Sequence, residues 1–273
     1  MTVALALIRK NLIDSRWMLA AIAPSLFGLT WLFVHIAHRI EAGMREMGGG
    51  RSAGMLRGLG GSSMNFSTAA IELAFWNHPF VVLLFAIWAI ARGSGAVAGE
   101  IEKGTMDLVM SRPVARPVFL VAQVASAAIG ILALAASMIA GNLVGTRYNT
   151  LETPATALDL ARPALNLVAF GWAIYGYTFL LSTVDHLRWR PNLIASVATL
   201  AMYIARIVAT IPSLEEDYGW LNKISIFKAY DPVEAVVKGE ALAFNAGLLG
   251  AIGGVGVGLG FFLFSRRDLP AGS

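Results

Sequence analysis

The stretch VFLVAQVASAAIGILALAASMIAGNLV, residues 118–144, decides the fold class of this chain. It contains no charged side chain, and about 20 apolar residues are enough for a helix to cross the hydrocarbon core of a bilayer. The composition of the 273-residue chain agrees, with 57% hydrophobic and only 14% charged residues, against about a quarter charged in soluble domains. The sequence therefore predicts an all-α membrane protein.

Further apolar runs lie on both sides of this stretch, and together they predict one membrane domain, residues 1–273, with six transmembrane helices. The predicted spans are residues 17–38, 79–98, 118–144, 165–184, 193–211 and 241–264. Residues 1–16 are too short to span, but Leu5, Ile8 and Leu12 fall on one side of a helix. This pattern predicts an amphipathic helix in the membrane interface, with a plain extension of the first span as the alternative.

The distribution of charged residues predicts the orientation of the six spans. Both termini lie on one side, and the segments on that side hold 11 Lys and Arg against 6 Asp and Glu. The loops on the opposite side hold 9 against 11 over a greater length. Positive residues are enriched in cytoplasmic segments, so we expect a multi-pass protein of the cell membrane with both termini in the cytoplasm. Because the net charge of +4 flanks apolar spans, it favours membrane topology over nucleic-acid binding.

The sequence lacks the motifs of several common catalytic and nucleotide-binding sites. It has no cysteine, no G-x-x-x-x-G-K-[ST] phosphate loop and neither of the common hydrolase motifs H-E-x-x-H and G-x-S-x-G. Arg206 is the one charge well inside a span; either it reaches the interface with its long side chain or it faces a substrate. The sequence therefore predicts neither catalytic residues nor a cofactor of its own.

The loop between the first two spans, residues 39–77, combines glycines with methionines such as Met44, Met47, Met55 and Met64. Three histidines lie at its margins, and thioether and imidazole groups suit copper(I). The alternative is that methionine only fills adaptable apolar surfaces. No ligand geometry follows from the spacing, so we predict no metal site.

The longest polar segment on the predicted cytoplasmic side is GEIEKGTMDLVMSRPVAR, residues 99–116. Acidic and apolar positions alternate in it, and Pro113 and Pro117 stop a helix and redirect the chain into the third span. The pattern predicts a short amphipathic cytoplasmic helix held between two spans. Its alternative is a solvated connector.

This segment also carries a resemblance. The pattern G-E-x-E-x-G-T, a leucine-containing turn and S-R-P-V-A-R resembles the signature of type-2 ATP-binding-cassette (ABC) exporter permeases. The resemblance extends to the interfacial helix, the six spans and the segment FKAYDPVEA, residues 227–235. In length and layout the chain is most similar to the permease type involved in copper maturation of nitrous-oxide reductase.

The resemblance implies a coupling helix that docks in a cleft of a separate ATPase subunit. Carried onto this sequence, the docking face would be Glu100, Glu102, Gly104 and Thr105, with Arg112 and Arg116 at its exit near lipid headgroups. ATP and Mg²⁺ would bind to the ABC ATPase partner, and a second permease copy or paralogue would complete the transporter. The resemblance also implies a pathway lined by spans one, two and five.

The last span carries a glycine series. Gly250, Gly254 and Gly258 recur at every fourth residue, and Gly256 and Gly260 repeat the spacing. Small residues let helices approach closely, so we expect these glycines to pack within the subunit, with a dimer seam as the alternative.

Three functions remain open on this basis. The first is a permease driven by a partner ATPase. The second is a non-transporting anchor that transmits ATPase-driven motion to partner proteins on the outer side, for example in metal-site maturation. The third is a membrane enzyme, which would need a buried polar cluster, whereas the candidate residues are widely spread.

Overall fold

The computed structural model describes residues 3–46, 75–106, 114–151, 154–231 and 240–267. In these ranges every regular element is a helix, so the predicted all-α class is confirmed. The elements are α1 (Val3–Asp14), α2 (Arg16–Glu46), η1 (Phe75–Asn77), α5 (Pro79–Gly95), α6 (Ala98–Glu102), α8 (Arg116–Tyr148), α9 (Ala157–Val184), α10 (Trp189–Thr210), α11 (Glu215–Tyr218), α12 (Leu221–Ile224), η2 (Ile226–Lys228) and α14 (Glu240–Arg266).

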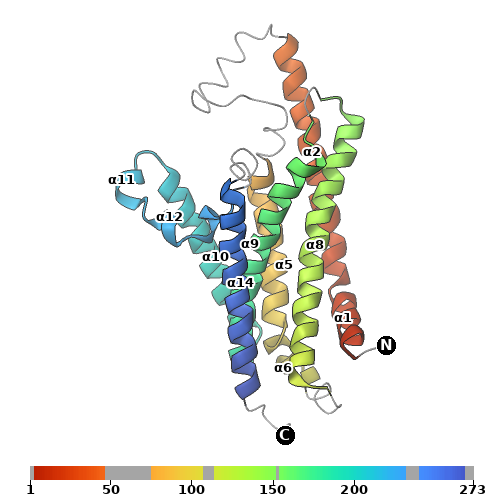
Figure 1. The fold of residues 1–273 in the computed structure, drawn as a ribbon, viewed down its shortest axis with the longest axis vertical. Coiled ribbons are helices and arrows are strands. Elements are labelled where there is room, and N and C mark those ends of the chain that lie inside the picture. Colours follow the sequence, from red (N-terminus) through yellow and green to blue (C-terminus); the bar gives the residue numbers. More distant parts are fainter. Residues whose placement is uncertain (1–2, 47–74, 107–113, 152–153, 232–239, 268–273) are drawn as a thin grey trace.

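Five helices are long and apolar enough to cross a membrane: α2, α8, α9, α10 and α14. The helix at the position of the second predicted span, α5, has 17 residues and is about 25 Å long at 1.5 Å per residue. This is slightly less than the roughly 30 Å of a hydrocarbon core. α5 nevertheless runs alongside the long helices inside the bundle (Figure 1).

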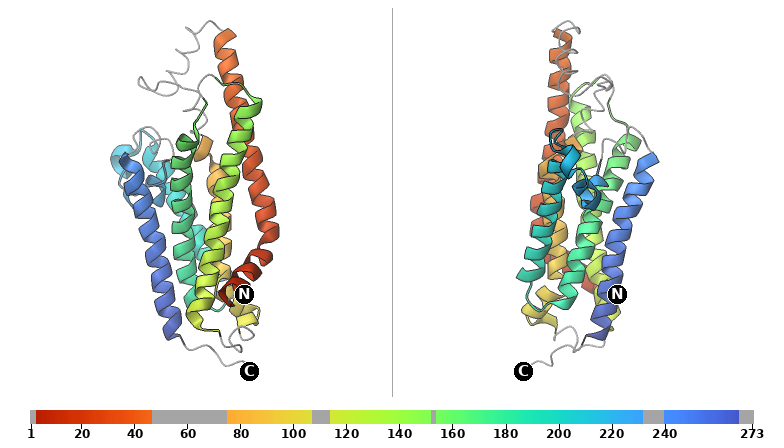
Figure 2. Two further views of the ribbon diagram at one scale, coloured as in Figure 1. Left: turned by 45° about the vertical axis from the view of Figure 1, so that its right-hand side comes forward. Right: turned by 90° about the vertical axis from the view of Figure 1, so that its left-hand side faces the viewer.

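The start of the fourth predicted span differs from the structure. α9 begins at Ala157, before the predicted residue 165, because Thr156 and Asp159 form a capping box at its start. Pro163 lies inside the helix and does not mark its beginning. At the N-terminus, α1 is a separate helix that ends at Asp14, and α2 begins at Arg16. α1 packs against α8, and both termini lie at the same end of the bundle (Figure 2).

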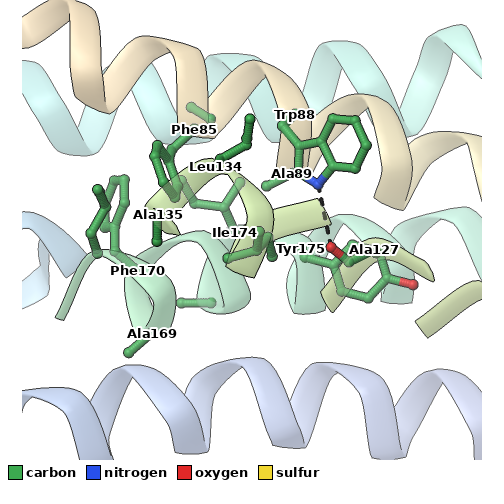
Figure 3. Close-up of a cluster of buried hydrophobic side chains, with 14 of the residues drawn as sticks. Phe85, Trp88, Ala89, Ala127, Leu134, Ala135, Ala169, Phe170, Ile174 and Tyr175 are labelled. Atoms are coloured by element: carbon green, nitrogen blue, oxygen red, sulfur yellow. Dashed lines mark hydrogen bonds between the residues drawn. The ribbon is translucent and has the colours of Figure 1, made fainter. Parts of the chain in front are cut away.

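The helix α9 is the centre of the bundle, packed against α5, α8, α10 and α14. Between α5, α8 and α9, large side chains such as Phe85, Leu134, Phe170 and Ile174 are fully buried (Figure 3). The buried Trp88 donates its indole N–H to the carbonyl oxygen of Ala127 at 3.3 Å. This contact joins α5 to α8 beside the main apolar cluster.

The closest helix pair, α9 and α14, meets at Gly256 of the second glycine series and at two glycines outside the predicted series, Gly176 and Gly253. A Cβ on Gly176 would lie 2.5 Å from Gly253 Cα, and a Cβ on Gly256 would lie 2.5 Å from the carbonyl carbon of Gly176. By contrast, a Cβ on any of the three glycines of the first series would meet nothing within 4 Å in the described part of the chain; these are Gly250, Gly254 and Gly258. Their predicted packing within the subunit is therefore wrong, because α14 is rotated so that the face of Gly253 and Gly256 meets α9. The alternative of a dimer seam stays a prediction.

After α10, the short helices α11 and α12 project from the side of the bundle (Figure 1), and the residues that follow them return to the core. The ring of Phe227 lies 5.0 Å from that of Phe170, and Tyr230 donates its hydroxyl to the carbonyl of Trp76 at 2.7 Å. Arg206 does not extend freely towards the interface, since it lies 3.6 Å from Asp231 and donates to Asn222 at 2.9 Å. The first residues of the segment FKAYDPVEA thus attach the connection between α10 and α14 to the end of the bundle opposite the termini.

Candidate functional site

The candidate site is the short helix α6 at the end of the bundle that carries both termini (Figure 1). α5 ends at Gly95, α6 follows from Ala98 to Glu102, and the chain then turns at Gly104 with a φ of 68°. Only glycine adopts this left-handed conformation without strain, so Gly104 fixes the end of α6. Of the predicted coupling segment, residues 107–113 lie outside the described residues, and Arg112 is among them.

The break between α5 and α6 is held by one buried side chain of α9. The Ser182 hydroxyl accepts from the backbone N–H groups of Val97 at 3.2 Å and Ala98 at 2.9 Å, and it donates to the carbonyl of Ser94 at 3.0 Å. Ser182 is fully buried, so water cannot replace it at these groups. It therefore fixes the angle at which α6 leaves α5.

We expect Ser182→Ala to lower the free energy of unfolding by about 2 kcal/mol, because it leaves buried backbone groups without partners. The measurement is thermal unfolding of the purified chain in detergent. Ser137→Ala is the matched control, since the Ser137 hydroxyl bonds only to the carbonyl of Leu134 in its own helix. Equal stability of both variants would show that Ser182 does not hold the break.

The turn between α9 and α10 clamps α6 from a second side through Arg188. Its guanidinium donates to the carbonyl of Ala91 at 3.3 Å, and its backbone N–H donates to Glu102 Oε2 at 2.9 Å. Its stem passes over Gly99, where a Cβ would lie 3.2 Å from Arg188 Cδ. Gly99 is needed here for close approach, and α6 is tied to two spans at once.

The N-terminal helix holds α6 from a third side. Glu100 is buried at 7% exposure, and Lys10 of α1 lies 3.2 Å from its Oε2 and 3.3 Å from its Oε1. Thr105 donates to the same Oε2 at 2.7 Å. A buried carboxylate needs such partners, because burying an unpaired charge is costly. Glu100 thus joins α1, α6 and the following turn.

These contacts change the predicted docking face. Glu100 and Thr105 point into the chain and bond to each other, so neither is free to contact a partner in this conformation. Glu102 and Gly104 are exposed, and between them lies the exposed Lys103. The exposed surface of this element is therefore Glu102, Lys103 and Gly104, which we call the α6 tip. Sequence reasoning missed Lys103, although its position between two matched motif residues was a usable signal.

Arg116 does not lie against α6. It begins α8 and donates to the carbonyl of Arg267 at 2.8 Å. Arg267 in turn donates to the carbonyls of Thr183 at 2.6 Å and Asp185 at 3.0 Å. Arg116 therefore belongs to a second network that ties the end of α14 to the end of α9.

The carboxyl of Asp185 lies in the same turn. Burial raises its pKa, but the backbone N–H groups of Leu187 and His186 and the Arg190 guanidinium lower it by more, so the pKa of Asp185 lies below its usual value. Asp185 is therefore ionised at neutral pH. The networks of Lys10, Ser182, Arg188 and Arg267 were not predicted, because each joins residues far apart in the sequence.

Within the described ranges, no three His, Asp or Glu side chains come together as a metal site. The histidines beside the methionine-containing loop have structural partners. His35 Nδ1 lies 2.9 Å from Asn149 Oδ1, His38 Nδ1 lies 2.8 Å from the carbonyl of Thr150, and His78 caps α5. Met47, Met55 and Met64 lie outside the described residues.

A comparison with protein families matches residues 8–269 to the ABC-2 family transporter proteins. The chain belongs to this family. An ABC-2 protein is a membrane permease component of an ABC transporter, and the match includes α6 and every membrane helix. A comparison with curated proteins gives no match. The finer likeness to the permease type of nitrous-oxide reductase maturation stays an expectation, since the match identifies the family and not a subtype.

Proposed function

We propose that this ABC-2 permease exports its substrate and that a separate nucleotide-binding ATPase drives it through the α6 tip. The observation that carries the proposal is the arrangement of α6: its tip is exposed, while its start is bonded to α1 and α9, and Glu102 of the tip also accepts from the backbone N–H of Arg188 in the α9–α10 turn. A push on such an element is passed directly to several helices. ATP and Mg²⁺ would bind in the partner, in keeping with the lack of a phosphate loop in this sequence.

The proposed orientation follows from the charges and the fold together. Both termini and α6 lie at one end of the bundle (Figure 2), and the segments at this end carry the excess of Lys and Arg. We therefore assign this end to the cytoplasm, where the ATPase would bind, and the protein to the cell membrane. A second permease copy or paralogue would complete the transporter.

A groove between α5 and α10 supports the proposed pathway. It has a volume of about 370 Å³ and is lined mainly by apolar side chains of these two helices. They correspond to spans two and five of the expected pathway, whereas α2, which is span one, contributes no lining residue among those described. α5 is the helix that continues into α6. A movement of α6 would therefore change the width of this groove, which supports coupling between the ATPase and the pathway.

The test is a detergent pull-down of the chain with its ABC ATPase co-expressed. We expect Lys103→Glu to reduce ATPase retention at least tenfold, because it reverses the exposed charge of the α6 tip and leaves the bond between Glu102 and Arg188 in place. Arg147→Glu is the matched control, since Arg147 is exposed at the opposite end.

Two outcomes would contradict the proposal. One is full retention of the ATPase by the α6-tip variant, and the other is equal loss in the control. If the ATPase is retained by wild type but no cargo moves across reconstituted membranes, the anchor function replaces export.

A further inference from the structure

A cavity of about 570 Å³ lies at the end of the bundle opposite α6. Its volume is within the roughly 300–1,000 Å³ of small-molecule sites. It is bounded by the end of α10, by α12 and η2, and by the first turns of α14. Its lining includes Arg206, Lys223, Lys228, Phe244, Leu248 and Ile252.

The mouth of this cavity is cationic. Arg206 and Asp231 lie 3.6 Å apart, so their charges compensate each other. Lys223 and Lys228 are both exposed, and among the described residues neither forms an ion pair with a carboxylate. The two lysines therefore leave a local charge of about +2, which attracts an anionic group.

The wall of the cavity on α14 is apolar. Phe244, Leu248 and Ile252 recur at every fourth residue and so share one face of the helix. They extend over about 12 Å along the axis at 1.5 Å per residue. Phe244 is 72% exposed and Leu248 is 44% exposed. Because α14 is a candidate span from Leu242 onward, this wall runs from the membrane surface into the hydrocarbon region.

We infer that this cavity binds an anionic phospholipid from the leaflet at this end of the bundle. The phosphate lies between Lys223 and Lys228, and an acyl chain lies along the wall of Phe244, Leu248 and Ile252. Along the membrane normal, the cationic mouth is followed by the apolar wall, as the headgroup of a lipid is followed by its acyl chain. A free anion would occupy the mouth and leave the apolar wall uncovered. The inference needs no ATPase and does not rest on the proposed function.

Native mass spectrometry of the purified chain, titrated with phosphatidylglycerol, tests the inference. Each lysine near an anionic headgroup contributes about a fivefold gain in affinity, so we expect Lys223→Gln combined with Lys228→Gln to weaken binding about 10- to 30-fold. Phosphatidylcholine, which has no net charge, should bind the wild type and this variant equally weakly.

The matched control is Arg9→Gln combined with Arg16→Gln, which removes two exposed positive charges at the other end. It should keep the phosphatidylglycerol affinity of the wild type. Leu248→Gln should weaken binding of phosphatidylglycerol because it places a polar group against the acyl chain. Unchanged melting temperatures would confirm that the variants are folded.

Three outcomes would overturn the inference. Equal losses in the two double variants would mean unspecific attraction to surface charge. Competition by inorganic phosphate, together with no effect of Leu248→Gln, would mean a site for a free anion. Equal affinity of wild type for both lipids would mean that the cavity does not select an anionic headgroup.

Discussion

Replacement of Gly176 by alanine is expected to lower the free energy of unfolding by about 2–3 kcal/mol, because overpacking at a tight contact costs up to this amount. The new Cβ would lie 2.5 Å from Gly253 Cα, so the clash is with backbone and no side-chain rotation can relieve it. α9 and α14 would have to separate along the closest contact of the bundle. The measurement is unfolding of the purified chain in detergent by heat or by a denaturing detergent.

The control for this prediction is Gly254→Ala on the other face of α14. A Cβ there meets nothing within 4 Å in the described chain, and alanine favours a helix more than glycine does, so this variant should be at least as stable as the wild type. Equal destabilisation by both variants would contradict the assignment of the α9–α14 seam. If Gly254→Ala instead weakens self-association without changing the stability of the single chain, the exposed glycine face is a seam between two copies.

Replacement of Glu100 by lysine is expected to lower the free energy of unfolding by about 2–3 kcal/mol. This loss is somewhat smaller than the loss expected when one partner of a fully buried ion pair is removed, because Lys10 is partly exposed. The variant would place two ammonium groups together at a position where Glu100 is only 7% exposed. It should also weaken ATPase retention, since α6 loses its contact with α1. Unfolding and the pull-down assay measure the two effects separately.

The exchanged pair, Lys10→Glu with Glu100→Lys, distinguishes a local ion pair from a general effect of charge. It should recover part of the lost stability, because the Thr105 hydroxyl can accept from the new lysine. Recovery should be incomplete, because Asp14 lies 3.6 Å from Lys10 and would repel a glutamate there. No recovery at all would contradict a direct Lys10–Glu100 interaction as the source of the stability.

Together these contacts distinguish α6 from a solvated connector. Ser182, Arg188 and Lys10 reach it from three different helices or turns, and each bonds to a different part of it. A connector without function would not need so many partners, because its backbone groups could bond to water. The rigid base and the exposed tip are the features that an element transmitting force requires.

The sequence by itself determined the class, the approximate spans and the place of the polar element between the second and third spans. These features depend on the length of apolar runs and on motifs that are continuous in the chain. The helix boundaries were less well predicted where a capping box acts before the apolar run, as Thr156 and Asp159 do in α9.

Only the tertiary structure decided which faces are buried. Glu100 and Glu102 are both acidic motif residues two positions apart, yet one pairs with Lys10 inside the fold and the other is exposed. Likewise, two glycine series on α14 have the same spacing, and the rotation of the helix against α9 selects the face of Gly253 and Gly256. The physical reason is that each choice depends on partners about 75 to 90 residues away, whose positions the local pattern does not contain.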